Sequence, residues 1–185
     1  MNVSPLEPLL AGPPASITRP GGKTGSNPER IEEEPNVIDL SAFAELIALD
    51  HGLCVVSTLR RDGSAHATVV NAGVLQDPGT QATVVGLVTA GGSRKLHHLR
   101  ADPRATIVAR AGWQWAAVEG TAEIIGPDDP HPDVDSEALR VLLQDIFRSA
   151  GGTHDDWDTF DRVMLEERRA AVLITPHRTY TNPGG

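Results

Sequence analysis

The residues best suited to chemistry lie in a short turn, residues 90–95, with the sequence AGGSRK. Its two glycines allow a ligand to approach the backbone closely, and Ser93, Arg94 and Lys95 can donate hydrogen bonds to an anion. A helix starting at the serine would add free backbone N–H groups and the positive end of its dipole. The turn therefore indicates a phosphate site, although it matches no P-loop or dinucleotide pattern. The same residues also suit an ordinary helix start whose arginines are exposed to solvent.

Other candidate residues lack the spacing that their chemistry needs. His97 and His98 are adjacent, so on a helix they point about 100° apart and cannot share a metal ion as an i, i+4 pair does. The acidic segment 126–135 lacks the glycine and final glutamate of a calcium loop, and its three prolines suit a solvated surface connector. Ser57 has no nucleophile-elbow pattern around it, and no Ser-His-Asp set is recognisable. We therefore assign no metal ligand and no catalytic residue.

Composition limits the partners that the protein can have. The chain of 185 residues carries a net charge of −9, which argues against a nucleic-acid or anionic-membrane surface. No apolar run approaches the roughly 20 residues of a membrane-spanning helix, and the N-terminus lacks a secretory signal pattern, so we expect a cytoplasmic protein. The single cysteine, Cys54, lies in an apolar β-type run and should pack as a small hydrophobic residue.

The hydrophobic pattern separates an N-terminal arm from one domain. Residues 1–36 are rich in Pro, Gly and charge and have no hydrophobic periodicity, which predicts a disordered or extended arm. Residues 37–185 form the expected domain. Within it, the patterns predict a helix over 37–52, strands over 53–60, 66–75 and 82–90, a short helix over 93–103, strands over 104–110 and 113–125, helices over 135–152 and 155–169, and a strand over 170–176.

This element order favours a mainly β fold. The Asp62-Gly63 pair predicts a hairpin between the first two strands, and no regular βαβ alternation occurs. A small antiparallel barrel with flanking helices is therefore expected. Trp113 and Trp115 alternate on the fifth predicted strand and would share one face, where they either pack or form a wall beside a planar ring.

Four segments together resemble a known family: CVVSTLRRDGSAHATVVNAGV, SRKLHHLRADPRATIV, GWQWAAVEGTAEI and the C-terminal DWDTFDRVMLEERRAAVLITPHRTYTNPGG. They are similar to the split-β-barrel flavin- and deazaflavin-binding proteins related to pyridoxamine-phosphate oxidases. The branch that they resemble is the actinobacterial one that uses the deazaflavin coenzyme F420. The resemblance implies a six-stranded antiparallel split barrel of the FMN-binding type, and a homodimer with the cofactor in a groove between subunits.

The resemblance also suggests which residues bind the cofactor. Lys95 would hold its phosphate, with Arg94 and Ser93 beside it. The remaining residues implied to line the groove are Ser57, Thr58, Thr68, Val69, Val70, Asn71, Thr89 and Trp113. The chain departs from the family pattern at Ala65-His66, where relatives often have a proline and a polar residue, and at His98, where many have asparagine.

The resemblance implies an oxidoreductase that transfers a hydride between reduced F420 and a small conjugated substrate. Such a cofactor carries the hydride itself, which agrees with the missing catalytic triad. One alternative is an FMN-dependent enzyme of the pyridoxamine-phosphate oxidase type, although the C-terminus offers only Arg178 to a substrate phosphate. Another is a non-catalytic flavin, deazaflavin or haem binder, in which His66, His97 or His98 would be the axial ligand.

Overall fold

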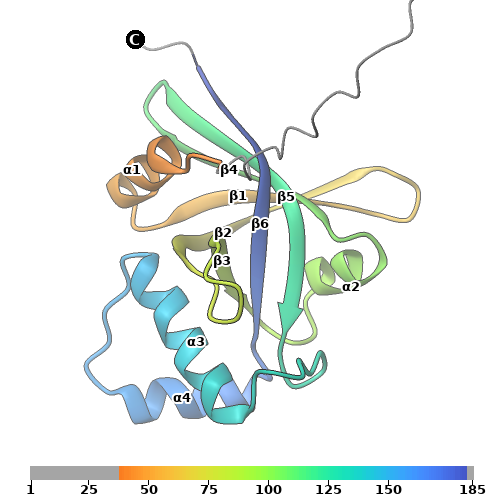
Figure 1. Ribbon diagram of the computed structural model, residues 1–185, viewed down its shortest axis with the longest axis vertical. Helices are drawn as coiled ribbons and strands as arrows, with labels where there is room; N and C mark the ends of the chain where they lie inside the picture. The colour runs from red at the N-terminus through yellow and green to blue at the C-terminus, as the bar shows by residue number, and fades with distance from the viewer. Residues whose placement is uncertain (1–37, 183–185) are drawn as a thin grey trace, which may run out of the picture. The chain divides into compact units, whose positions relative to one another are not determined.

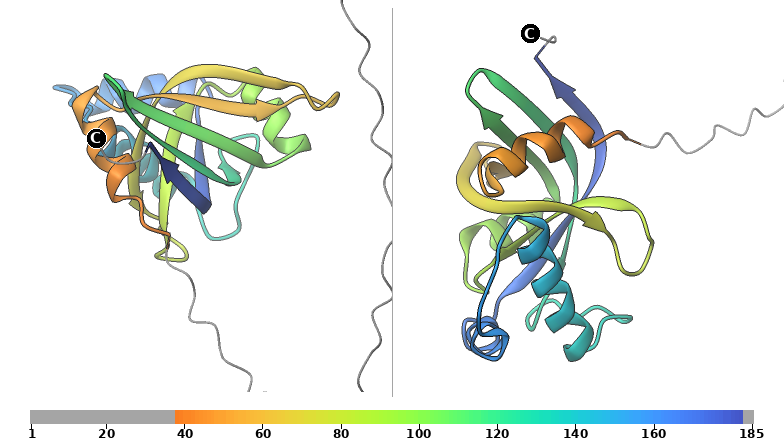
Figure 2. Two further views of the ribbon diagram at one scale, coloured as in Figure 1. Left: turned by 90° about the horizontal axis from the view of Figure 1, so that it is seen from above. Right: turned by 90° about the vertical axis from the view of Figure 1, so that its left-hand side faces the viewer.

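The computed structural model describes residues 38–182, and the predicted N-terminal arm lies outside them. Six antiparallel strands close into a barrel in the order β1-β2-β3-β6-β5-β4, with four helices around it (Figures 1 and 2). The elements are α1 (Ser41–Leu49), β1 (Leu53–Leu59), β2 (Ala65–Gln76), β3 (Thr83–Thr89), α2 (Arg94–Ala101), β4 (Arg104–Ala111), β5 (Gln114–Ile125), α3 (Ser136–Ser149), α4 (Trp157–Glu166) and β6 (Ala170–Thr181). The predicted six-stranded antiparallel barrel with flanking helices is confirmed.

The barrel core is filled by alternate residues of the strands and by two helices. α1 contributes Phe43 and α2 contributes Leu96 and Leu99, all buried in the same hydrophobic cluster. α1 is shorter than predicted and ends at Leu49; the turn that follows closes at Gly52, which has a φ of 76° and donates its backbone N–H to the Ile47 carbonyl at 2.8 Å. The left-handed conformation favours glycine there.

A second core lies outside the barrel, where α3 packs against β2, β3 and β6 and Met164 of α4 packs at its edge. α3 places Leu142, Leu143 and Ile146 on its buried side, as its helical spacing predicts. Gly86 of β3 allows this close packing, because a Cβ there would lie 2.9 Å from the Ile146 side chain.

Two expectations about the strands are corrected. Trp113 is not on a strand but in the turn of the β4–β5 hairpin, so it does not share a strand face with Trp115. β6 continues beyond its predicted end at Pro176 as far as Thr181. A β-bulge at Glu119/Gly120 lies opposite this proline, and bulges accommodate a residue that cannot donate to the ladder.

Candidate functional site

The predicted anion-binding residues gather where β3 passes into α2. Lys95 donates from Nζ to the Thr89 hydroxyl at 3.2 Å, and Thr89 donates in turn to the Ser93 hydroxyl at 3.1 Å. Thr89 is only 5% exposed, whereas Arg94 is exposed at the start of the helix. The structure therefore brings Thr89, Ser93, Arg94 and Lys95 together, and we call these four residues the clamp.

The glycine turn before α2 positions the clamp by docking on a neighbouring turn. Gly91 donates its backbone N–H to the Glu167 carbonyl at 3.2 Å, and a Cβ at Gly91 would lie 2.5 Å from the Arg168 carbonyl oxygen. Gly92 has open space around it instead, with no atom within 4 Å of the position of a Cβ. The first glycine thus serves close packing, and the second leaves the helix start accessible.

The clamp has an electrostatic character that suits an anion. Burial lowers the pKa of Lys95, and the positive charge of Arg169 lowers that pKa further. The first turn of α2 contains no acidic residue, and Lys95 forms no ion pair within residues 38–182. A half-buried ammonium without a counter-charge gains stability when an anion binds beside it.

A group of polar side chains lies beside the clamp, between β1, β2 and α2. The Thr58 hydroxyl, in a residue 1% exposed, lies 3.1 Å from Nδ1 of His98, and the rings of His66 and His98 stack edge to face at 5.0 Å. The pKa of His98 is lowered, mainly by burial and then by the charges of His66, Arg60, His97 and Arg94. The departures from the family pattern at His66 and His98 thus meet in space.

Two buried polar atoms in this group have no hydrogen-bond partner among residues 38–182: Nδ1 of His66 and Oγ1 of Thr68. Both residues belong to β2 and, as residues i and i+2, point to the same face of the strand. Leaving such atoms unpaired costs about 1–3 kcal/mol each. Their position suits a bound water molecule or a polar ligand atom.

The other predicted lining residues are divided between two faces of the sheet. Thr68 and Val70 point into the barrel, whereas Val69 and Asn71 point outward. On β1, Thr58 points inward and Ser57 outward. The side chains of Ser57 and Thr58, both expected to line the groove, therefore lie on opposite faces of the sheet, because successive strand residues alternate.

The outer face of the barrel carries an apolar row. Val69, which is 67% exposed, pairs in register with Val55, which is 41% exposed, and Val55 pairs with Val108. Trp113 stands apart from this row at the hairpin tip and is 95% exposed. Exposed apolar rows of this kind are typical of surfaces that associate.

Residues 41–181 match the family described as pyridoxamine 5′-phosphate oxidase. The chain belongs to this family. The match spans all six strands of the barrel, so the split-barrel family expected from the sequence is confirmed.

Several solved structures share the fold of this family member at low sequence identity. A pyridoxamine 5′-phosphate oxidase-related, FMN-binding protein of Nostoc punctiforme has a TM-score of 0.56 at 15% identity, covering 76% of this chain and 78% of its own. A conserved hypothetical protein of Mycobacterium tuberculosis has a TM-score of 0.54 at 24% identity, covering 80% and 88%. A haem-binding protein of Mycobacterium smegmatis has a TM-score of 0.50 at 19% identity, covering 80% and 56%. These likenesses establish the common fold.

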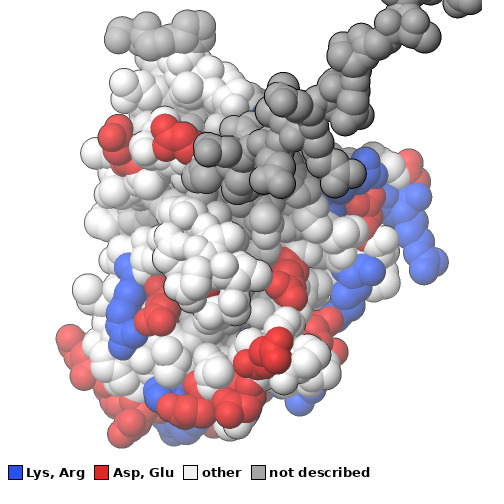
Figure 3. Space-filling view, in the orientation of Figure 1, with Lys and Arg blue, Asp and Glu red and all other residues white. Residues whose placement is uncertain are grey.

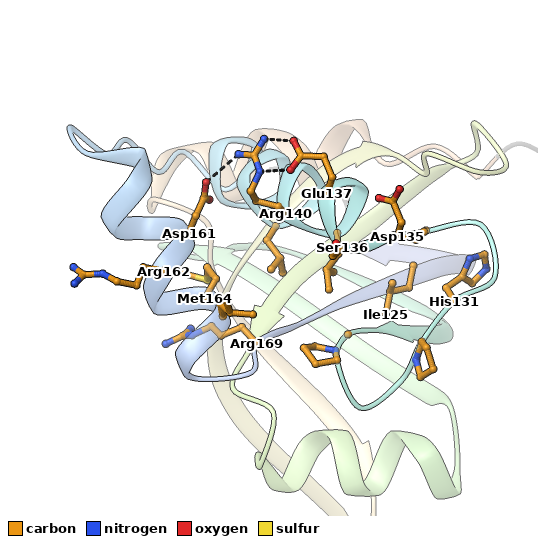
Figure 4. Close-up of a pocket in the computed structure, with 17 residues that line it drawn as sticks. Ile125, His131, Asp135, Ser136, Glu137, Arg140, Asp161, Arg162, Met164 and Arg169 are labelled. Carbon is orange, nitrogen blue, oxygen red and sulfur yellow. Dashed lines mark hydrogen bonds and ion pairs between the residues drawn. The ribbon is translucent and has the colours of Figure 1, made fainter.

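Sequence reasoning missed a cavity of about 640 Å³ between α3, α4 and the loop 126–135 (Figure 4). The loop is largely exposed, as expected of a surface connector. It also forms ion pairs with two other elements: Asp129 pairs with Arg100 of α2 at 2.7 Å, and Asp128 pairs with Arg168 after α4. No local pattern links these residues, because the partners lie 29 and 40 positions apart.

Several kinds of chemistry receive no support from the part of the chain that the structure describes. It contains no group of three or more His, Cys, Asp or Glu residues that could hold a metal ion. Cys54 is buried, and burial raises the pKa of its thiol to about 12, which keeps it protonated and unreactive. Among the described helices, none is long and apolar enough to cross a membrane.

Proposed function

We propose that this family member is an oxidoreductase that binds the phosphate of a flavin-type cofactor at the clamp. The observation that carries the proposal is Lys95, a half-buried cation that donates to the Thr89 hydroxyl and to no carboxylate of residues 38–182. Coenzyme F420 is the preferred cofactor because the sequence resembles the F420-dependent branch, and FMN is the alternative. The reaction is hydride transfer between the reduced coenzyme and a small conjugated substrate.

The residues near the clamp fit such a cofactor. Lys95 and Arg94 supply positive charge for a phosphate, and the backbone N–H groups at the start of α2 add to it. The unpaired polar atoms of His66 and Thr68 lie on the inner face of β2, where they suit a bound water molecule that supports this strand from inside. The cofactor supplies the hydride chemistry, so these residues have only to bind, orient and exclude water.

The proposal includes a homodimer that completes the cofactor groove. The apolar row formed by Val69, Val55 and Val108 supports association through the outer barrel face. In that arrangement Ser57, Val69 and Asn71 would face the partner and the cofactor, while Thr58, Thr68 and Val70 support the strand from inside. Trp113, at the exposed hairpin tip, would reach toward the groove from the side.

The test of the cofactor is equilibrium titration of the purified protein with F420 and with FMN, followed by fluorescence. We expect tighter binding of F420 and a protein that light scattering identifies as a dimer. Tighter binding of FMN would overturn the F420 assignment, and an absorbance shift of added haem in the Soret band would favour the haem alternative. Oxidation of the reduced cofactor by a panel of enones and quinones then tests turnover. Failure with every acceptor would indicate a protein that carries the cofactor without turning it over.

The test of the interface is Val69→Asp, which places a charge in the apolar row. We expect monomers and weaker cofactor binding, because a buried unpaired charge is costly at an interface. The matched control is Val141→Asp on α3, also an exposed valine but far from the row. A Val69→Asp protein that remains dimeric and binds cofactor normally would show that the dimer uses another face.

A further inference from the structure

The 640 Å³ cavity between α3, α4 and the loop 126–135 has the volume of a small-molecule site, since such sites span about 300–1,000 Å³ and are mostly apolar. The apolar side chains that line it include Ile125, Val134, Leu139, Leu143, Met164 and Leu165. None of the four clamp residues lines it. The cavity is therefore separate from the proposed cofactor site.

The α3 and α4 walls of the cavity are tied together, so the space is preformed. Arg140 of α3 donates to Asp161 of α4 at 2.9 Å, and Gln144 donates to the same carboxylate at 2.8 Å. Further along α3, Phe147 packs against Phe160 of α4 with ring centroids 4.9 Å apart. These contacts hold the two helices at a fixed separation and oppose collapse of the apolar space.

The third wall is the loop 126–135, which is largely exposed but anchored at several points. Asp129 accepts two hydrogen bonds from Arg100, at 2.7 and 2.8 Å. His131, which lines the cavity, lies 3.3 Å from the Glu123 carboxylate. Asp135, at the end of the loop, accepts a hydrogen bond from a backbone N–H in the first turn of α3 and caps that helix. The loop is therefore an ordered wall.

The charged side chains that border the cavity are all engaged with other protein groups or point away from it. On the α3 side, Glu137 and Asp161 both pair with Arg140, which uses that guanidinium fully (Figure 4). On the α4 side, Arg162 and Arg169 extend away from the cavity in Figure 4, and Arg169 pairs with Glu167 at 2.6 Å. In Figure 3, charges of both signs gather over this end of the molecule.

This arrangement of charges selects against a charged ligand. None of the described residues that line the cavity presents a free counter-charge to it, and a charge that leaves water without a partner is costly. A peptide would bring backbone N–H and C=O groups that also need partners, which an apolar lining does not supply. Apolar surface, by contrast, gains free energy when it is buried against the lining.

We propose that this cavity binds a neutral, mostly hydrocarbon molecule that carries a single hydroxyl or carbonyl group, as a second ligand independent of the cofactor. The hydrocarbon body would contact Leu139, Leu143 and Met164. Ser136 borders the cavity in the first turn of α3, and its hydroxyl can donate or accept a hydrogen bond with the one polar group of the ligand. A carboxylate or an ammonium group in the same place would lose its hydration without meeting an opposite charge.

The test uses N-phenyl-1-naphthylamine, an uncharged dye whose fluorescence rises in apolar surroundings, and four eight-carbon competitors at pH 7. Octan-1-ol and octan-2-one are neutral, octanoate is an anion and octylamine is a cation. We expect the dye to bind and the two neutral compounds to displace it, with the two charged compounds weaker by roughly tenfold or more. Absence of dye binding, or displacement by octanoate or octylamine as strong as that by octan-1-ol, would overturn the proposal.

Two variants of lining residues and two controls locate the site. Met164→Gln keeps the side-chain length and places an amide on the apolar surface, so it should weaken binding of the dye and of octan-1-ol roughly tenfold. Leu165→Gln changes a residue that is 73% exposed, which leaves the core intact, and should weaken both compounds in the same direction. Val141→Gln, on α3 but outside the cavity, and Arg162→Gln, whose guanidinium points away from it, should change neither. Unchanged binding in both lining variants would overturn the proposal.

Two further measurements separate this ligand from other occupants. Val69→Ser removes apolar surface from the outer barrel face, so dye binding that falls in this variant while it persists in Met164→Gln would place the site at that face and overturn the proposal. A change of oligomeric state in Met164→Gln, measured by light scattering, would show that a second copy of the chain covers the cavity and would also overturn it. Thermal unfolding of every variant, without ligand, confirms that the fold is retained. Because F420 and FMN titrations are run separately, failure here leaves the proposed function untouched.

Discussion

Replacing Lys95 by methionine should weaken cofactor binding by about 10- to 150-fold. The substitution keeps the length and the apolar stem of the side chain and removes only the ammonium group that donates to Thr89 at 3.2 Å. A hydrogen bond to a charged group contributes about 1.5–3 kcal/mol, and each 1.4 kcal/mol is about tenfold in affinity. Lys95→Arg retains the positive charge and should lose less, although a planar guanidinium cannot reproduce the geometry of an ammonium.

The same substitution should leave the stability of the cofactor-free protein unchanged or raise it. Burial and the charge of Arg169 both lower the pKa of Lys95, which means that the folded protein disfavours its charged form. A charge with that property destabilises the fold relative to the unfolded chain at neutral pH. Removing it therefore has opposite effects on affinity and on stability, a combination expected of a binding residue and not of a structural one.

Fluorescence titration with F420 and FMN measures the affinity, and thermal unfolding without cofactor measures the stability. The control is Arg61→Met, which removes an exposed positive charge on the β1–β2 hairpin. Wild-type binding should also weaken at alkaline pH as Lys95 loses its proton, and Lys95→Arg should lack this decline. An unchanged dissociation constant in Lys95→Met would refute the placement of the phosphate, and so would an equal loss in Arg61→Met.

Three further changes test the surroundings of the clamp. The pKa of His98 is lowered in the fold, so the contribution of this residue to the free energy of unfolding is complete above about pH 6.5 and declines as the pH falls toward the folded pKa. In urea unfolding from pH 8 to 5, the free energy of unfolding should therefore decline less in His98→Asn than in the wild type. Gly91→Ala should cost roughly 1–3 kcal/mol, because its Cβ would lie 2.5 Å from the Arg168 carbonyl, while Gly92→Ala should be nearly neutral in the same thermal unfolding assay. Cys54, with a pKa of about 12, should not react with a disulfide reagent at pH 8 until the protein is unfolded, and rapid native labelling would contradict its burial.

The sequence predicted the helices and strands well where short-range residue patterns determine them. The spacing of Phe43 and Ile47 specifies α1, and the Asp62-Gly63 pair specifies the first hairpin, in which Gly63 has a φ of 80°. Trp113 was misplaced because the hairpin turn contains both Gly112, at a φ of 60°, and Trp113, and the β-type residues that follow extended the predicted strand one residue too far. The end of β6 was misplaced at Pro176 because a bulge beside this proline, where His177 is left without a partner on β5, allows the strand to continue.

The site was predictable only in part. The residue types of the AGGSRK turn suggest an anion site, which stays a prediction, and the structure gathers Ser93, Arg94 and Lys95 there with Thr89. Four consecutive residues of β2 could not all line one ligand with their side chains, because alternation sends Val69 outward. The cavity left no sequence signal, since it depends on how α3 and α4 are spaced over the outside of the barrel, a tertiary property.

The aspartates of the loop 126–135 have a structural role. Asp128 pairs with Arg168, on which Gly91 packs, and Asp129 pairs with Arg100 near the end of α2. Asp128 therefore supports the turn before the clamp, and Asp129 holds the end of α2 after it. The rest of the loop 126–135 forms one wall of the cavity. Each of the two aspartates neutralises one arginine through its ion pair. Most residues of the loop 126–135 are exposed, so it is the expected surface connector, and these ion pairs also anchor neighbouring segments.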